Sequence, residues 1–225
     1  MKLFEIIRKH LESGTFSRDD YDWEINHSKL PQGIQVNGNT SFEENVDLKY
    51  RLYDAWQNAL KEGRNNDLFT LAKYYVSTWG GVRRNSQSTL EKYINEEPSE
   101  LILDQRAKGV ASWSKVLCIR NPDEYPIFDA RVSLSLNALQ ILAPISDADF
   151  IRFPDLPSQS RVINDVAPKI RKFLSNKKIS KTDNFYQKYI SILKSEIFDE
   201  YRICELEMLL FSATEKLAYQ VLNKI

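Results

Sequence analysis

Apolar residues recur at intervals of three and four along most of the chain, the spacing that places them on one face of an α-helix. Residues 2–12 show it clearly, with Leu3, Phe4, Ile7 and Leu11 on one stripe. The same spacing predicts further helices over residues 46–62, 66–78, 87–95, 98–107, 111–120, 129–142, 159–175, 182–199 and 203–223. The pattern therefore predicts an all-α fold.

Two stretches lack this spacing. Residues 14–44 mix glycine and proline with polar residues, so we expect an irregular segment with a short strand at Ile34–Val36. Residues 143–158 are rich in proline and are expected to form a loop.

The length of 225 residues fits one helical domain, 1–225, with an organisation into two lobes left open. Within it we distinguish an irregular N-terminal segment (1–45), the helices of 46–142 and the C-terminal helices of 159–225.

Composition narrows the function classes. Hydrophobic residues make up 42% and aromatic residues 12% of the chain, which suffices for a core, and 7 Gly and 8 Pro are few for a turn-rich β-sandwich. Lys+Arg and Asp+Glu are both 31. The equal numbers of basic and acidic residues exclude a polycationic nucleic-acid binder, but they are compatible with a local basic face.

The metal-ligating residue types are scarce. Two cysteines, Cys118 and Cys204, and two histidines, His10 and His27, show no Cys-x-x-Cys or His-x-x-x-His spacing. We therefore expect no metal and no cofactor. Charged residues interrupt the N-terminal apolar stretch, and there is no apolar run of about 18 residues. We expect a soluble, cytoplasmic protein without a membrane span.

The candidate catalytic residues are concentrated in residues 108–134. Lys115 falls in the middle of a predicted helix, and its neighbours one turn away are uncharged. Such surroundings remove water from an amine and lower its pKa, which suits a Schiff-base nucleophile. The alternative is a lysine that extends from the edge of a buried helix into solvent.

Asp129 comes directly before the apolar-periodic run that starts at Val132. Its carboxylate is placed to accept backbone N–H groups as a helix N-cap, and the helix dipole keeps it ionised. The alternative to a catalytic role is this cap alone.

Together these residues resemble the helix-hairpin-helix DNA glycosylases, in particular the 8-oxoguanine DNA glycosylase branch. Gly109-Val110 and Lys115-Val116 match the hairpin and its lysine, and Pro126-Ile127-Phe128-Asp129 matches the proline and aspartate that follow. The helix Glu205–Phe211 is similar to the closing helix of that fold. The hairpin is degenerate, because it is two residues longer than the family pattern and lacks the second glycine.

The resemblance implies a helical glycosylase-like bundle that acts on DNA without a metal. A damaged or modified nucleotide is extruded from the duplex, Lys115 attacks C1′ and forms an imine, and Asp129 stabilises the positive charge on the sugar. Elimination of the 3′-phosphate then nicks the strand. Relatives also occur in bacterial anti-phage operons, so base-excision repair and defence with operon partner proteins both stay open, as do the excised base and the oligomeric state.

Several residues are candidates for binding DNA or the extruded base. Arg83 and Arg84 follow two glycines between predicted helices. This segment is either a loop that binds a phosphate or an ordinary connector between helices. Trp113 and Phe128 are candidates for the base pocket or for the core. Further candidates for DNA contacts surround the motif, namely Lys108, Gly109, Arg120 and Arg131. A third basic group is more typical of a solvated helix end, namely Lys169, Arg171, Lys172, Lys177, Lys178 and Lys181.

Two other function classes compete with the enzyme. One is a non-catalytic nucleic-acid-binding module on the same helical scaffold, and the other is a protein-interaction module, which the neutral net charge also suits.

Overall fold

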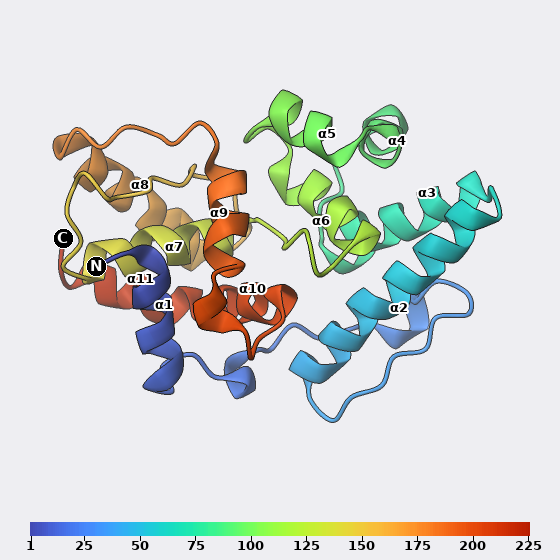
Figure 1. Ribbon diagram of the computed structural model, residues 1–225, viewed down its shortest axis with the longest axis horizontal. Coiled ribbons are helices and arrows are strands. Elements are labelled where there is room, and N and C mark those ends of the chain that lie inside the picture. The colour runs from blue at the N-terminus through green and yellow to red at the C-terminus, as the bar shows by residue number, and fades with distance from the viewer. The chain divides into compact units, whose positions relative to one another are not determined.

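The computed structural model describes residues 1–225, except for the side chain of Gln105 (Figure 1). The described backbone contains eleven α-helices, a few 3-10 and π-helical turns, and no β-strand. The prediction of an all-α fold is confirmed. The strand expected at Ile34–Val36 does not form, because no other segment pairs with it; one isolated bridge joins Arg152 and Lys181.

The chain divides into two compact units. The terminal unit consists of Met1–Tyr21 and Phe128–Ile225, and the central unit is Asp22–Ile127. This division differs from the expected lobes, which kept residues 129–142 with the helices before them. The reason is the packing of that helix, which contacts the N-terminal helix and the C-terminal helices.

The core of the terminal unit surrounds α7 (Ala130–Leu142), which is buried on every side from Val132 to Ile141. A helix of this kind must be covered all round, and α7 packs against α1, α8, α10 and α11 (Figure 1). The other elements of this unit are α1 (Leu3–Glu12), η1 (Arg18–Asp20), α8 (Arg161–Asn176), α9 (Phe185–Leu193), η4 (Glu196–Phe198), α10 (Ile203–Ser212) and α11 (Thr214–Leu222).

Side-chain amides of α7 hold the proline-rich loop in place. Asn137 exchanges two hydrogen bonds with the backbone of Phe153, both of 3.1 Å. Gln140 does the same with Ile151, at 2.9 and 2.8 Å. Because both amides are buried, these bonds satisfy backbone groups that have no partner in a helix or sheet.

The core of the central unit surrounds α6 (Val110–Arg120), which is buried from Ser112 to Ile119. It packs against α2, α3, α4, α5 and η3. The bounds of the other elements are η2 (His27–Lys29), α2 (Ser41–Lys61), α3 (Asn65–Lys73), the π-helical turn η3 (Tyr74–Trp79), α4 (Gln87–Asn95) and α5 (Pro98–Gln105).

Several of the expected helices differ from the observed ones for local reasons. The helix α2 begins at Ser41 instead of residue 46, because Thr40 Oγ1 accepts the Glu43 N–H at 3.2 Å and caps it. The helix expected over 66–78 ends as the π-helical turn η3. The helix expected over 203–223 is two helices, since the buried Thr214 hydroxyl binds the carbonyls of the preceding turn. Likewise, residues 182–199 contain the shorter α9 and the turn η4.

Candidate functional site

The start of α6 requires glycine for two reasons. Gly109 has φ +68°, in the left-handed region, and a Cβ at this position would overlap the Tyr93 hydroxyl oxygen. Its carbonyl accepts the N–H groups of Ser112 at 2.8 Å and Trp113 at 3.0 Å, and no side chain caps the helix. The first turn of α6 therefore depends on the backbone alone.

Gly109→Ala is expected to lower the free energy of unfolding by about 2 kcal/mol, measured by chemical denaturation. Gly63→Ala is the matched control, because Gly63 also has φ +68° but no atom lies within 4 Å of its Cβ position. The larger loss at position 109 should fall to that of the control when Tyr93→Phe removes the overlapping oxygen. Equal losses at both glycines would contradict the steric explanation.

Lys115 lies on the buried part of α6. Only 4% of its surface is exposed, and Nζ donates to the carbonyl oxygen of Ala111 at 2.7 Å. The amine therefore does not extend into solvent, as a lysine at the edge of a buried helix would. The side chain is therefore buried within the central unit.

A loop after η3 lies against the same part of α6. A Cβ on Gly80 would overlap Lys115 Cε and would come within 2.8 Å of Cδ. Further along the loop, Asn85 Nδ2 donates to the Ser112 hydroxyl at 2.8 Å. The structure thus brings together two features that are about 30 residues apart in the sequence, the glycine-arginine loop and the candidate nucleophile.

The basic residues of the central unit fall into two kinds. Arg83, Arg84 and Lys108 are exposed, and no hydrogen bond or ion pair engages their side-chain cations among the described residues. Arg120 is different, because its Nη1 donates to the Glu96 carbonyl at 2.7 Å, beyond the end of α4. Burial lowers the pKa of Arg120, and the Glu97 carboxylate acts in the opposite direction. Arg120 therefore has a structural role in this unit, which leaves the first three as candidates for phosphate contacts.

Asp129 caps α7 in the terminal unit. Its Oδ1 accepts the N–H groups of Arg131 at 2.9 Å and Val132 at 3.1 Å, so the predicted N-cap is confirmed. The carboxylate is half-buried, and its other oxygen, Oδ2, has no hydrogen-bond partner among the described residues. One oxygen serves the helix and the second is available for other chemistry.

Arg131 has partners other than the two expected from the sequence. A cation in the first helical turn opposes the helix dipole, so the sequence predicts a phosphate or Asp129 itself as the partner of Arg131. Its Nη2 instead lies 3.4 Å from Glu215 Oε1, and its guanidinium lies 4.8 Å from the centre of the Phe211 ring. The charge is thus offset within the terminal unit.

Both base-pocket candidates lie in the core. Trp113 is fully buried, and its indole N–H donates to the Lys108 carbonyl at 3.1 Å. Phe128 is also fully buried, with ring centres of Phe185 and Tyr189 at 4.9 and 5.2 Å. Neither ring is accessible for stacking on a base, and the core alternative describes both.

The third basic group behaves as a solvated helix end. Arg171 is 2.9 Å from Asp155, and Lys177 is 2.9 Å from Asp147. Lys169, Lys172 and Lys181 are exposed.

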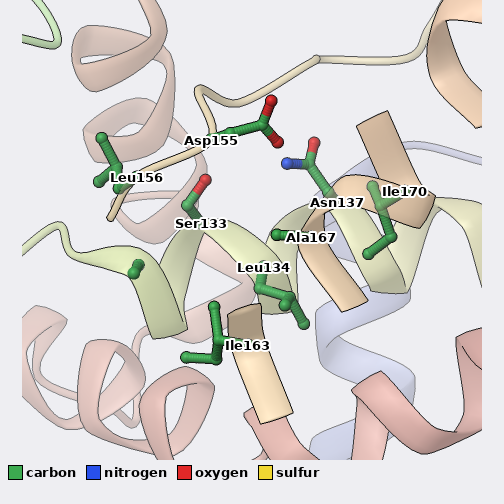
Figure 2. A pocket seen from close by; sticks show the side chains of 9 residues that line it. Ser133, Leu134, Asn137, Asp155, Leu156, Ile163, Ala167 and Ile170 are labelled. Carbon is green, nitrogen blue, oxygen red and sulfur yellow. The ribbon is translucent and has the colours of Figure 1, made fainter. Parts of the chain in front are cut away.

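A small cavity lies between α7, α8 and the loop before α8 (Figure 2). The Asp155 carboxylate and the Asn137 amide point toward one another there, and Ser133 lies beside them. Its free volume of about 10 Å³ holds about one water molecule, far less than a nucleobase needs.

The residues that sequence reasoning missed are Gly80 as a packing partner of Lys115, and the pair Asn85–Ser112. Ser112 carries a weak signal, since it lies three residues before Lys115 and so on the same face of the helix. Nothing in the local sequence indicates which helix the loop contacts.

Among the described side chains, no group of three or more His, Cys, Asp or Glu is arranged to bind a metal ion. In the part of the chain that the structure describes, no helix combines the length and the apolar character needed to span a membrane. Comparison of this chain with protein-family models, curated proteins and solved structures gives no match.

Proposed function

We propose that this protein is a DNA N-glycosylase with an associated lyase activity, in which Lys115 is the nucleophile. The observation that carries the proposal is the position of this lysine. It is 4% exposed on the central helix of its unit, and it contacts the loop that presents Arg83 and Arg84 to solvent. An amine is the group that forms an imine with a sugar carbon.

The reaction follows from the resemblance. An extruded nucleotide presents C1′ to Lys115 Nζ, which bonds to C1′ as the bond from C1′ to the base breaks. The ring bond between C1′ and O4′ then opens, one amine proton goes to the departing base and the other to O4′, and the sugar becomes linked to the lysine as an imine. The Asp129 carboxylate stabilises the positive charge that develops on the sugar. Its oxygen Oδ2, which the helix does not use, is the atom suited to this role.

The duplex is held through its phosphates. Arg83, Arg84 and Lys108, which are exposed, supply positive charge for these contacts. Such contacts are independent of base sequence, so selection of the base falls to other residues.

Borohydride trapping tests the proposal. The protein is incubated with duplexes that each carry one damaged or modified base, borohydride is added, and covalent adducts are separated by denaturing electrophoresis. An adduct is expected with at least one duplex, together with release of that base. The identity of the base then separates a repair role from defence against phages with modified DNA.

A second candidate function is a nucleic-acid-binding module without catalysis. The observations that favour it are the burial of Trp113 and Phe128 in the core and the single-water size of the cavity beside α7. This function predicts DNA binding that weakens with salt and no adduct with any duplex. Absence of DNA binding would favour the third class, a protein-interaction module.

Replacing Arg83 and Arg84 together by alanine is expected to weaken DNA binding by a similar factor for every duplex. The slope of log affinity against log salt should become shallower by about 2, because two phosphate contacts are lost. Binding is measured by fluorescence anisotropy from low to moderate salt. The matched control replaces Lys169 and Lys172, an exposed pair on α8, and should leave the slope unchanged. An unchanged slope for the arginine pair would place the loop away from the DNA.

A further inference from the structure

The loop Gly80–Asn85 is attached to α6 at two points. At its start, Gly80 packs against the methylene groups of Lys115, and at its end Asn85 donates to the Ser112 hydroxyl at 2.8 Å. Ser112 and Lys115 are separated by one helical turn, so both contacts fall on the same face of α6. Arg83 and Arg84 lie between the two attachment points and are exposed.

Gly80 is needed for its small size and not for its backbone conformation. Its φ of −84° and ψ of −2° are available to any residue. A side chain is nevertheless excluded, because a Cβ would overlap Lys115 Cε and lie 2.9 Å from the Tyr75 carbonyl oxygen. The backbone here is held by the π-helical turn, through Gly80 N–H to Tyr75 O and Val82 N–H to Val76 O, both at 3.0 Å. Gly80 therefore lies against the lysine side chain with no room for a side chain of its own.

The chain turns at the next residue. Gly81 has φ +68° and open space around its Cβ position. After Val82, the loop is joined to α6 by a neutral hydrogen bond between two side chains, Asn85 and Ser112. Such a bond shifts a local equilibrium by only about fivefold.

We infer that the loop Gly80–Asn85 is a gate over Lys115 that DNA phosphates open through Arg83 and Arg84. With Asn85 bound to Ser112, the loop lies on the lysine and keeps it from solvent. A phosphate bound by the two arginines draws the segment after Val82 outward, which breaks the Asn85–Ser112 bond and exposes Nζ. Gly80 and Asn85 are thus positioning residues. The inference rests on the proposed function in its choice of Lys115 as the reactive group and of DNA as the ligand.

Residue-resolved acetylation tests the gate without requiring catalysis. A water-soluble amine-acetylating reagent is applied for short times, and mass spectrometry gives the rate at Lys115 relative to Lys61, an exposed lysine at the end of α2. Asn85→Ala and Ser112→Ala should each raise the relative rate about fivefold, and the double variant should add nothing further, because both remove one bond. Asn85→Ala is paired with thermal melting to confirm that it folds.

The ligand arm uses a plain duplex without any modified base, at saturating concentration. The duplex should raise the relative rate at Lys115 in the unaltered protein and leave it unchanged in the Arg83→Ala, Arg84→Ala variant. Equal rates at Lys115 with and without Asn85, or a lower rate with the duplex, would overturn the gate. If acetylation behaves as expected but borohydride traps no adduct, the gate stands and the catalytic role of Lys115 fails. Trapping together with unaltered acetylation rates would leave the catalytic role in place and overturn the gate.

A steric variant supplies independent evidence. Gly80→Ala should displace the Lys115 side chain and raise its acetylation rate, and Lys115→Ala should reduce the loss of thermal stability that Gly80→Ala causes. Melting losses that are the same in both backgrounds would show that Gly80 does not hold the lysine.

Discussion

Lys115→Gln is expected to abolish borohydride trapping and strand nicking while the protein still folds and binds DNA. Glutamine retains N–H donors for the Ala111 carbonyl and fits in the space of the lysine, so the buried face of α6 stays filled. It has no amine that can form an imine. The expected loss is more than about a thousandfold in the rate of nicking, as for removal of a covalent nucleophile in other enzymes.

The measurement is single-turnover nicking and trapping on the duplex that the unaltered protein cuts. Lys61→Gln is the control for loss of a lysine, because Lys61 is exposed in the same unit and distant in sequence from the motif. Circular dichroism and anisotropy check folding and DNA binding. A persistent adduct with Lys115→Gln would show that Lys115 is not the nucleophile, and Lys108 would be tested next.

Asp129→Asn is expected to slow base release by about a hundredfold, with a change in the free energy of unfolding of only a few tenths of a kcal/mol. The structure explains why the two effects separate. Both backbone N–H groups bind Oδ1, which asparagine retains as its carbonyl oxygen. The substitution exchanges Oδ2, the oxygen without a partner among the described residues, for an NH₂ group and removes the charge.

Asp129→Ser provides a second test of the same point, because serine also caps helices but carries no charge. Both variants should melt within a few degrees of the unaltered protein and both should release base slowly. Asp129→Ala should lose the cap as well and cost about 1 kcal/mol of stability. Normal base release by Asp129→Asn would leave Asp129 as a helix cap and remove its catalytic role.

The helices could largely be predicted because their signals are local. The helix over 87–95 has the predicted bounds, and those of α6 and α7 differ by about one residue. Apolar spacing decides all three, and side-chain caps at Ser86 and Asp129 fix the starts of α4 and α7. The missed start of α2 was also encoded locally, in the Thr40–Glu43 capping pair. The division into two units could not be read in this way, because it depends on which distant helices cover α7.

In the candidate site, too, the properties set by local sequence could be predicted and those set by distant contacts could not. The place of Lys115 within a helix and the cap at Asp129 follow from helical periodicity and position. The partners of Arg120 and Arg131 and the burial of Trp113 and Phe128 do not, because each depends on contacts with other elements. A cation or an aromatic ring near a motif looks alike in the sequence whether it faces solvent or a neighbouring helix.

By itself, the sequence determined that this chain is helical, that Lys115 lies in an apolar helix and that Asp129 opens the next one. Each of these properties is set by residues within a few turns of one another, whose spacing and hydrogen-bonding groups are visible in the printed chain. Only the tertiary structure decided that Gly80 lies against Lys115 and that Asn85 binds Ser112. Those contacts join residues about 30 positions apart, and they arise because burial of α6 brings the loop onto it, which no local pattern encodes.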